Sequence, residues 1–372
     1  MKKKNKILLF THNFPSTSFE RKDAGTFLYD FCISLSRKAN IEIVTPFFPG
    51  NKEKYKNFSV NWFPWSGDGK KLGDWKITSP FSIIRFFVLL YQGSVYSINH
   101  VKLLKPDVIL AAWAVPSGIF AYISFIFTGH KYSIWCLGSD LNKYVRYPII
   151  RQLMYLSLMN AQNVFVNSYS LDDKVKKFVG RNAIFLPAIT NLDSKNIKSN
   201  KKSGKVKFLF LGRLEKVKGV DILLNACVLL NQKKYKLFIG GDGNMESDLK
   251  KFILKNGLQN SVEMLGRLNE KEISKYMSIC DYLIIPSRNE SLPLVMIEAS
   301  RFKLPIIASD VGDCKRIIDK YNVGFSFERG NIFALSKIMN NVILNKYKFG
   351  NFKKFSSDFD QKRAIEIYLK TI

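Results

Sequence analysis

Acidic residues are scarce in this sequence. Asp and Glu total 30 against 58 Lys and Arg, so the formal net charge is +28 at pH 7. Such an excess creates a positive potential that attracts nucleic acid, anionic lipid or phosphate-bearing substrates. Abundant Asn, Ile and Phe accompany the lysines, so a compositional bias of the whole proteome is an alternative explanation. Charge alone does not select one of these partners.

Cysteine is also scarce. The five cysteines are far apart and none belongs to a CxxC pair, which argues against a disulfide framework and against a zinc site. The apolar run at residues 7–10 is too short for the core of a signal peptide. We therefore expect a protein of a reducing, cytoplasmic compartment.

Only one uncharged stretch, residues 108–128, has the length of about 20 residues that a membrane-spanning helix needs. Pro116 and Gly118 interrupt it. We therefore predict a buried strand at 108–110, a loop, and a buried helix at 119–127 instead of a membrane span.

The chain of 372 residues is too long for one ordinary core, and 47% of it is hydrophobic, which predicts two globular domains. Short apolar runs alternate with helical patterns such as the one at 25–37. The strand-like runs are 7–10, 41–45, 164–166, 206–211, 237–240, 282–285 and 306–308. Such alternation is typical of parallel sheets with crossover helices, hence of an α/β fold with doubly wound lobes.

Residues 191–205 are polar and rich in lysine, which indicates a linker. We predict a first domain at 1–190, a second at 203–350, and a C-terminal helix at 351–372 that packs back on the first. Ligands of open α/β sheets bind beyond the carboxyl ends of the strands. The two lobes would therefore face each other across a cleft that holds the ligands.

The first chemical motif is GRLEKVKG at 212–219, which joins an apolar strand to a helix. Gly212 allows close backbone approach, a helix N-terminus favours an anion, and Arg213 and Lys218 supply charged donors for a diphosphate. A solvated basic loop is the alternative. The turn that contains Gly241, in GDG at 241–243, is a weak signal by itself.

The strongest feature is residues 286–299, where Glu290 precedes Glu298 by eight positions. Glu290 follows a strand, and a helix begins near Pro293. The backbone N–H groups at the start of this helix would hold phosphate oxygens. A separation of roughly 12 Å suits a nucleotide-sugar better than a metal. Glu298 would bind ribose hydroxyls, as acids do in other nucleotide folds, or it is an ordinary salt-bridged helical acid.

In this order and spacing, GRLEKVKG, GDG, LGR, CDYLIIPSRNESLPLVMIEAS and PIIASDVGD resemble the donor lobe of retaining glycosyltransferase family 4, over residues 208–313. The resemblance implies the GT-B fold, with two Rossmann-like lobes, and a nucleoside-diphosphate sugar as donor. It also implies a role for each motif residue: Arg213 and Lys218 bind the diphosphate, Glu290 the sugar, the backbone amides of Leu294 and Val295 the phosphate, and Glu298 the ribose.

The first lobe resembles the family less closely. Gly25 corresponds to a glycine that lets the backbone approach the transferred sugar and diphosphate. Leu137 stands where many members place a histidine that touches the donor sugar. His12, after the first strand, would reach the ligand or is structural. Asp140 would contact the acceptor or cap a helix.

The resemblance implies a front-face mechanism that retains anomeric configuration, in which the leaving diphosphate helps deprotonate the acceptor hydroxyl. Cations and helix amides would stabilise the diphosphate charge. We therefore expect no protein nucleophile, no cofactor and no metal. The DxD sequence at 358–360 lies between the basic pairs 353–354 and 362–363. We interpret it as part of the surface and not as a metal-binding motif.

We expect the acceptor to be a glycan or a lipid-linked glycan of surface polysaccharide biosynthesis. The lysine-rich segments 2–6 and 52–56 and the aromatic-rich segment 81–96 suggest peripheral attachment to the anionic inner face of the cell membrane. Three alternatives stay open: a sugar-nucleotide epimerase of the same fold, a catalytically silent sugar-binding protein, and a nucleic-acid-binding protein. The last has no recognition helix or RNP-like motif to support it, so no nucleic-acid partner is expected.

Overall fold

The computed structural model describes residues 4–15, 25–47, 55–65, 80–188, 192 and 204–372. The chain divides into two compact units. Unit 1 comprises Met1–Ile189 together with Gln361–Ile372, and unit 2 comprises Thr190–Asp360. Most of the proposed linker at 191–205 lies outside the described residues.

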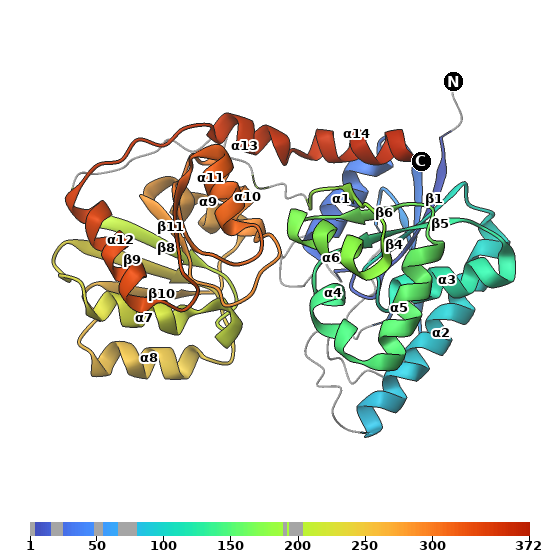
Figure 1. Ribbon diagram of the computed structural model, residues 1–372, viewed down its shortest axis with the longest axis horizontal. Coiled ribbons are helices and arrows are strands. Elements are labelled where there is room, and N and C mark those ends of the chain that lie inside the picture. Colours follow the sequence, from blue (N-terminus) through green and yellow to red (C-terminus); the bar gives the residue numbers. More distant parts are fainter. Residues whose placement is uncertain (1–3, 16–24, 48–54, 66–79, 189–191, 193–203) are drawn as a thin grey trace. The chain divides into compact units, whose positions relative to one another are not determined.

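Unit 1 is built on a seven-stranded parallel sheet in the order β3-β2-β1-β4-β5-β6-β7 (Figure 1). Its strands are β1 (Lys6–Phe10), β2 (Asn40–Pro46), β3 (Ser59–Phe63), β4 (Val108–Ala112), β5 (Tyr132–Cys136), β6 (Val164–Val166) and β7 (Ile184–Phe185). Successive strands run outward from β1 to β3 and then return to β4 on the other side of β1. The strand order therefore reverses between β1 and β4, which is where such sheets bind ligands.

Helices cover both faces of this sheet because its strands are apolar on both sides. They are α1 (Thr26–Ser36), α2 (Pro80–Leu104), α3 (Ser117–Thr128), α4 (Ser139–Lys143), the short 3-10 helix η2 (Tyr144–Arg146), α5 (Pro148–Asn160), α6 (Tyr169–Val179) and α14 (Gln361–Thr371). Leu8 and Phe10 of β1 share one core cluster with α2, α3, α5 and α6. Ile7 and Leu9 point to the other cluster, with α1 and α14, as the period of two along a strand requires.

Unit 2 has a six-stranded parallel sheet in the order β10-β9-β8-β11-β12-β13. Its strands are β8 (Val206–Leu211), β9 (Tyr235–Gly240), β10 (Val262–Gly266), β11 (Tyr282–Ile285), β12 (Ile306–Ser309) and β13 (Gly324–Phe327). Its helices are η3 (Lys216–Lys218), α7 (Val220–Val228), α8 (Glu246–Lys255), α9 (Glu270–Ile279), α10 (Leu294–Arg301), α11 (Cys314–Tyr321), α12 (Ile332–Leu344) and α13 (Phe352–Asp358). Here the strand order reverses between β8 and β11.

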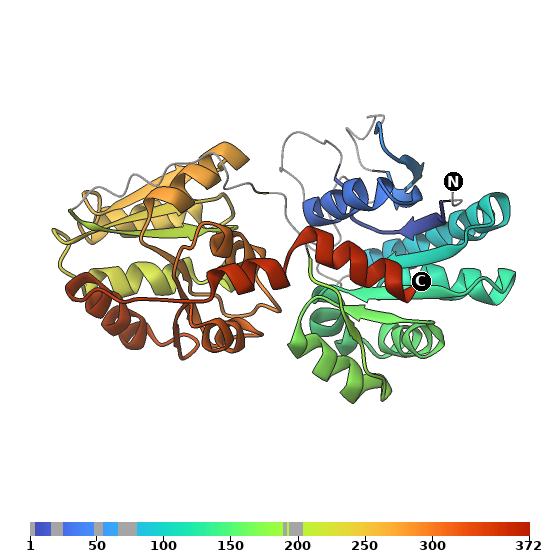
Figure 2. The same ribbon diagram turned by 90° about the horizontal axis from the view of Figure 1, so that it is seen from above.

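The C-terminal segment differs from the single helix expected over 351–372. It forms two helices, α13 in unit 2 and α14 in unit 1. The rings of Phe355 and Phe359 pack on Tyr321 of α11, which holds α13 in unit 2. The side chain of Gln361 donates to the backbone carbonyl of Asp30 at 3.1 Å, and α14 lies beside α1 in unit 1 (Figure 2).

The strands expected at 164–166, 206–211 and 282–285 are confirmed with the same bounds, and the other predicted strands differ by one or two residues at their ends. The region 108–128 is the predicted strand, loop and helix. A different helix, α2, is the one described helix with the length and composition of a membrane span, and a third of its apolar window is buried. None of the five cysteines, all of which lie in the described residues, is in a disulfide, and all five are buried.

Candidate functional site

The loops at the carboxyl edge of the unit 2 sheet pack backbone against backbone at three glycines. A Cβ atom on Gly219 would lie 1.9 Å from the carbonyl oxygen of Pro286, and one on Gly241 would lie 1.9 Å from that of Gly212. A Cβ atom on Gly312 would lie 2.4 Å from the carbonyl oxygen of Ser291. All three glycines have positive φ angles, so both the conformation and the space exclude a side chain. The loops after β8, β9, β11 and β12 are thereby held together at the point where the strand order reverses.

Lys218 and Glu290 form an ion pair within these loops. The Lys218 Nζ lies 2.6 Å from the Glu290 Oε1, and the side chains are 25% and 12% exposed. The hydroxyl of Ser287 donates to the same carboxylate oxygen at 2.9 Å. Lys218 ends the turn after β8 and Glu290 lies in the loop after β11, so two residues 72 positions apart meet in one place. We predict Arg213, Lys218 and Glu290 to be catalytic, and the structure joins two of these three side chains directly.

A second ion pair fastens the same two loops and was not anticipated from the sequence. The two terminal guanidinium nitrogens of Arg288 each lie 2.7 Å from an oxygen of the Asp221 carboxylate, and Arg288 also donates to the carbonyl of Lys216. Burial acts to raise the pKa of Asp221, but hydrogen bonds from Arg288 and Lys216 outweigh it and hold the pKa below its usual value. Nothing local in the sequence relates positions 221 and 288, so only the fold reveals that this pair fixes the loop that carries Lys218.

Arg213, the third predicted catalytic residue, lies in the same loop as Lys218 but points elsewhere. Its guanidinium pairs with Glu215 at 2.6 Å, and its side chain is 61% exposed. Gly212 directly before it lies against Gly241, as described above. An exposed guanidinium on a short loop is free to exchange its carboxylate for a stronger anion.

The helix α10 begins at Leu294, directly after the loop that carries Glu290. Pro293 is the N-cap residue and has an extended conformation. The helix therefore begins one residue later than it would if Pro293 occupied the first helical position. The backbone N–H groups of Leu294 and Val295 have no partner within the helix because they belong to its first turn. Glu298 follows in the second turn and is 8% exposed. The predicted residues of unit 2 therefore all occupy the carboxyl edge of one sheet.

At the carboxyl edge of unit 1, His12 follows β1 and packs edge-on against Trp113, which follows β4, with ring centroids 4.7 Å apart. The His12 Nδ1 is buried and has no hydrogen-bond partner among the described residues. Burial lowers the pKa of His12 to about 3, so its imidazole is neutral at pH 7. Trp113 has a positive φ of 71°, an unusual conformation for a bulky residue. These two rings occupy the reversal point of the unit 1 sheet.

Asp140 is fully buried and holds two loops of unit 1 together. One carboxylate oxygen accepts the backbone N–H of Ala114, after β4, at 2.9 Å, and that of Leu137, after β5, at 3.3 Å. The other accepts the N–H groups of Gly138 and Leu141 at 2.9 and 3.0 Å. Burial raises the pKa of Asp140 although these four N–H groups oppose the shift. The carboxylate thus fixes the backbone of both loops by accepting their N–H groups.

Gly25 is the N-cap residue of α1 and has a φ of 93°. A Cβ atom there would lie 2.5 Å from the carbonyl oxygen of Asn13, the residue after His12. The loop after β1 therefore closes on the start of α1 through this glycine.

The residues of the DxD sequence have structural contacts. Asp358 accepts a hydrogen bond from the hydroxyl of Tyr321 at 2.7 Å, and Phe359 is fully buried. In the described part of the chain, no group of three or more His, Cys, Asp or Glu side chains is placed to hold a metal ion.

The two doubly wound sheets and their carboxyl-edge loops define the fold class, GT-B. The lipopolysaccharide outer core galactosyltransferase WaaB in its apo form has a TM-score of 0.75 at 16% identity and matches 98% of both chains. Anabaena HepE in complex with UDP-glucose has a TM-score of 0.71 at 16% identity, over 99% of this chain and all of the other. Identities this low establish the fold alone.

Residues 193–359 match the model of the glycosyl transferases group 1 family. The matched residues lie within unit 2 and make up less than half of the chain. An uncharacterized glycosyltransferase of Methanocaldococcus jannaschii is 33% identical over 162 residues, which cover 42% of this chain and 45% of the relative. The putative teichuronic acid biosynthesis glycosyltransferase TuaC of Bacillus subtilis is 27% identical over 229 residues, 59% of this chain and 57% of the relative. The chain thus matches about half the length of these curated relatives.

Proposed function

We propose that this protein is a retaining glycosyltransferase that moves a hexose from a nucleoside-diphosphate sugar to a glycan or lipid-linked acceptor during biosynthesis of a cell-surface polysaccharide. The observation that carries the proposal is the Lys218–Glu290 ion pair at the reversal point of the unit 2 sheet. The complex of HepE with UDP-glucose supports the class of donor. The name of TuaC supports the class of product.

In this proposal the paired side chains exchange partners when the donor binds. Lys218 would leave Glu290 for the diphosphate, and Glu290 would accept hydrogen bonds from hydroxyls of the donor sugar. Arg213 would exchange Glu215 for the same diphosphate, because a guanidinium binds phosphate in a two-point geometry. The cations are thus already held near their targets before the donor arrives.

The start of α10 supplies the rest of the donor site. The free N–H groups of Leu294 and Val295 would bind phosphate oxygens at the positive end of the helix dipole. Glu298, one turn further, would accept bonds from the ribose hydroxyls. Gly212 and Gly241 have no side chains, so the nucleotide could approach the backbone of these loops closely.

Catalysis would be electrostatic. As the bond from the sugar to the diphosphate breaks, negative charge grows on the leaving group, which Lys218, Arg213 and the α10 amides would stabilise. The leaving diphosphate would take the proton of the acceptor hydroxyl on the same face, which retains the anomeric configuration. No metal or other cofactor is needed for this step, so we expect full turnover in the presence of a chelator. Loss of turnover on chelation would contradict this expectation.

Unit 1 would bind the acceptor. His12 would offer a neutral imidazole to a sugar hydroxyl, and Gly25 would let the loop after β1 approach the transferred sugar. Asp140 would contribute by positioning the loops after β4 and β5, because its oxygens are engaged by backbone N–H groups. We propose a cytoplasmic location with peripheral attachment to the membrane that carries the acceptor.

The decisive experiment compares Lys218→Ala and Glu290→Ala with Lys250→Ala. Lys250 forms an exposed ion pair with Glu246 on α8 of the same unit and serves as the matched control. Donors are screened by mass spectrometry over UDP-, GDP- and ADP-sugars. We expect the first two variants to lose at least ~100-fold in transfer, as removal of a transition-state contact does, and the control to keep it.

Unchanged turnover in both site variants would remove the proposed site. Incubation with the donor alone separates transfer from epimerisation, because an epimerase converts the donor sugar without an acceptor. Accumulation of a new sugar nucleotide in that incubation would overturn the transferase proposal.

A further inference from the structure

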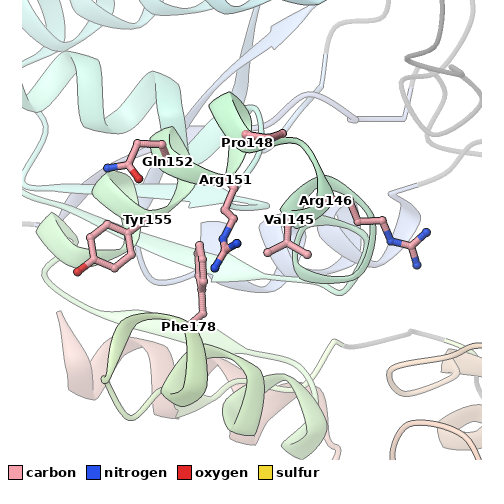
Figure 3. A pocket seen from close by; sticks show the side chains of 7 residues that line it. All are labelled: Val145, Arg146, Pro148, Arg151, Gln152, Tyr155 and Phe178. Carbon is pink, nitrogen blue, oxygen red and sulfur yellow. The ribbon is translucent and has the colours of Figure 1, made fainter.

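A groove of about 400 Å³ lies on unit 1 between η2, α5 and α6. Its seven lining residues include none of those assigned above to the donor or the acceptor, and none of them is acidic. Figure 3 shows Arg151 pointing into the groove between Val145 and Phe178. The volume lies at the small end of the range for ligand sites, which is about 300–1,000 Å³.

Four polar side chains line this groove and have no polar partner in the protein. Within the described part of the chain, no hydrogen bond or ion pair engages the side chains of Arg146, Arg151, Gln152 or Tyr155. The Arg151 guanidinium lies near an aromatic ring instead, 5.8 Å from the centroid of Phe178. A guanidinium beside an amide and a hydroxyl offers donors for an anionic group and for neighbouring hydroxyls.

The two walls of the groove are fixed before any ligand binds. Arg181, directly after α6, donates to the backbone carbonyls of Leu158 and Ala161 at the end of α5, at 2.8 and 2.7 Å. The rings of Tyr155 on α5 and Phe178 on α6 meet edge to face, with centroids 5.9 Å apart and planes at 83°. One nearby arginine is thus engaged in holding the walls together. A groove that is already ordered loses little entropy on binding.

The angle between these rings favours a sugar over a nucleic acid. Single-stranded nucleic acid stacks its successive, parallel bases on aromatic faces, whereas Tyr155 and Phe178 form a corner. A pyranose ring can place its apolar C–H face against one ring and direct its hydroxyls sideways, here toward Gln152. The arginines add affinity for negative charge, which a neutral sugar would not use. The combination fits a sugar that carries a carboxylate or a phosphate.

The surroundings of the groove are positive as well. α5 contains no Asp or Glu. Lys176 and Lys177 directly precede Phe178 in the last turns of α6, and both are exposed. The acidic residues of α6, Asp172 and Asp173, lie in its first half. The resulting potential raises the local concentration of anions.

The chain connects this groove to the acceptor edge of unit 1. Asp140 lies in the first turn of α4 at that edge, η2 follows α4 directly, and η2 ends at Arg146. Six steps of helical backbone span at most about 12 Å, even at the rise of a 3-10 helix. A glycan whose end lies at the acceptor edge therefore reaches the groove with a sugar further along its chain.

Resting on the proposed transferase function, we propose that this groove is an acceptor subsite for an anionic sugar. Arg151 binds the carboxylate or phosphate in a two-point geometry, and Arg146 adds a second charge at the η2 end. Gln152 and the Tyr155 hydroxyl bond to hydroxyls of the same sugar, and Phe178 packs against its apolar face. The acceptor is thus a glycan of at least two sugars that carries negative charge behind the sugar to be extended.

Calorimetry without a donor tests the subsite independently of transfer. Tetragalacturonate and mannose 6-phosphate are the anionic sugars, and maltotetraose and mannose are their neutral counterparts. Inorganic phosphate and glycerol 3-phosphate, the latter with the chemistry of a lipid headgroup, supply charge without a sugar ring. We expect at least one anionic sugar to bind ~10-fold or more tightly than its neutral counterpart and than both ring-free phosphates, because only it makes the charged and the ring contacts together. The tighter of the two identifies the anionic group as carboxylate or phosphate.

Variants assign the binding to the groove. Arg151→Gln should weaken binding of that anionic sugar by at least ~10-fold, through loss of charge-assisted hydrogen bonds, and Gln152→Ala by roughly threefold. Arg329→Gln is the matched control, since Arg329 is an exposed arginine of unit 2, and should bind like the unaltered protein. Thermal unfolding midpoints identify any misfolded variant, and Arg146→Gln then replaces Arg151→Gln.

The same measurement on Lys218→Ala keeps the two proposals apart. This variant should lose transfer but bind the anionic sugar like the unaltered protein, because Lys218 lies in unit 2. Unchanged turnover in Lys218→Ala and Glu290→Ala would count against the transferase proposal, whereas sugar binding and its loss in Arg151→Gln would still establish the groove as a site.

Three results would overturn the subsite. In the first, neither anionic sugar binds more tightly than its neutral counterpart. In the second, Arg151→Gln and Arg329→Gln weaken binding equally, which would assign it to the net charge of +28 alone. In the third, a single-stranded oligothymidine binds more tightly than both sugars and loses this affinity in Arg151→Gln, which would make a nucleic acid the occupant.

Discussion

The carboxyl edge of unit 2 holds its polar side chains in ion pairs between loops, whereas the same edge of unit 1 holds a neutral imidazole, an indole and a buried carboxylate. In unit 2, Lys218–Glu290 joins the loop after β8 to the loop after β11, and Arg288–Asp221 joins the first turn of α7 to the loop after β11. In unit 1, Asp140 binds backbone N–H groups and His12 lacks a hydrogen-bond partner for its Nδ1 within the described residues. Two sheets of the same topology thus offer different chemistry at the same position.

Under the proposed function, this difference would let the two units bind two kinds of ligand. Paired charges and close-packed glycines suit a diphosphate, which is the same in every donor and needs fixed cations. An edge with a neutral imidazole, and with its carboxylate engaged by backbone N–H groups, suits sugar hydroxyls, which need hydrogen-bond donors and acceptors but no net charge. Substitutions at the two edges should therefore impair different properties of the protein.

The largest effect is expected at Gly219. Gly219→Ala places a Cβ atom 1.9 Å from the Pro286 carbonyl oxygen, in addition to straining a φ of 72°. We expect a loss of about 3 kcal/mol or more, because backbone atoms must move, and at least ~10-fold weaker binding of a nucleoside diphosphate. Urea unfolding and calorimetry with UDP and GDP measure the two effects.

Gly180→Ala is the matched control. Gly180 ends α6 with a φ of 69°, but a Cβ atom there meets nothing within 4 Å. Only the conformational strain remains, about 1 kcal/mol. Equal losses in the two variants would show that the loops after β8 and β11 are not in close contact.

The next effect concerns the buried carboxylate of unit 1. Asp140→Asn turns one acceptor oxygen into an amide donor that faces backbone N–H groups, which should cost about 3 kcal/mol. Amide hydrogen exchange should rise in the loops after β4 and β5 while unit 2 is unchanged. Asp107→Asn is the control, since exposed Asp107 accepts one N–H, that of Lys6 at 2.7 Å, and should lose under ~1 kcal/mol. An unaltered exchange pattern in Asp140→Asn would contradict the positioning role.

The effect that is smallest at neutral pH, and that grows only as the pH is lowered, is a pH dependence at His12. Burial lowers the pKa of His12 in the folded protein to about 3, whereas the imidazole of the unfolded chain titrates near 6.5. Between these values the unfolded chain binds an extra proton, so the stability of unit 1 falls as the pH is lowered through this window, by up to about 1.4 kcal/mol per pH unit. His12→Phe removes this contribution and should flatten the slope. Identical slopes before and after the substitution would show that His12 is not buried.

The sequence predicted the parts of the fold that depend on neighbouring residues. Strands such as β8 and β11 were found because a buried parallel strand is a continuous apolar run, and the turns after them because glycine marks tight loops. The site residues of unit 2 follow from the same local rule, since a motif after each parallel strand must reach the same sheet edge.

What depends on distant residues was not predicted. Arg288 and Asp221 are 67 positions apart, and no periodicity connects them. For Asp140 the sequence offered a contact with the acceptor or a helix cap, because its bond from the backbone N–H of Ala114, 26 positions away, leaves no trace in the sequence. The two C-terminal helices were taken for one, because only tertiary contacts with α11 and α1 distinguish Phe355 from Gln361.

The return of the chain from unit 2 to unit 1 has a consequence for how the protein is made. Tyr368 of α14 is fully buried between the rings of Phe31 and Phe165, at centroid distances of 5.6 and 5.7 Å. A ribosome delivers this ring only after the whole of unit 2, so unit 1 begins first but completes its core last. In a nascent chain, the rings of Phe31 and Phe165 would therefore lack their contact with Tyr368 while unit 2 folds.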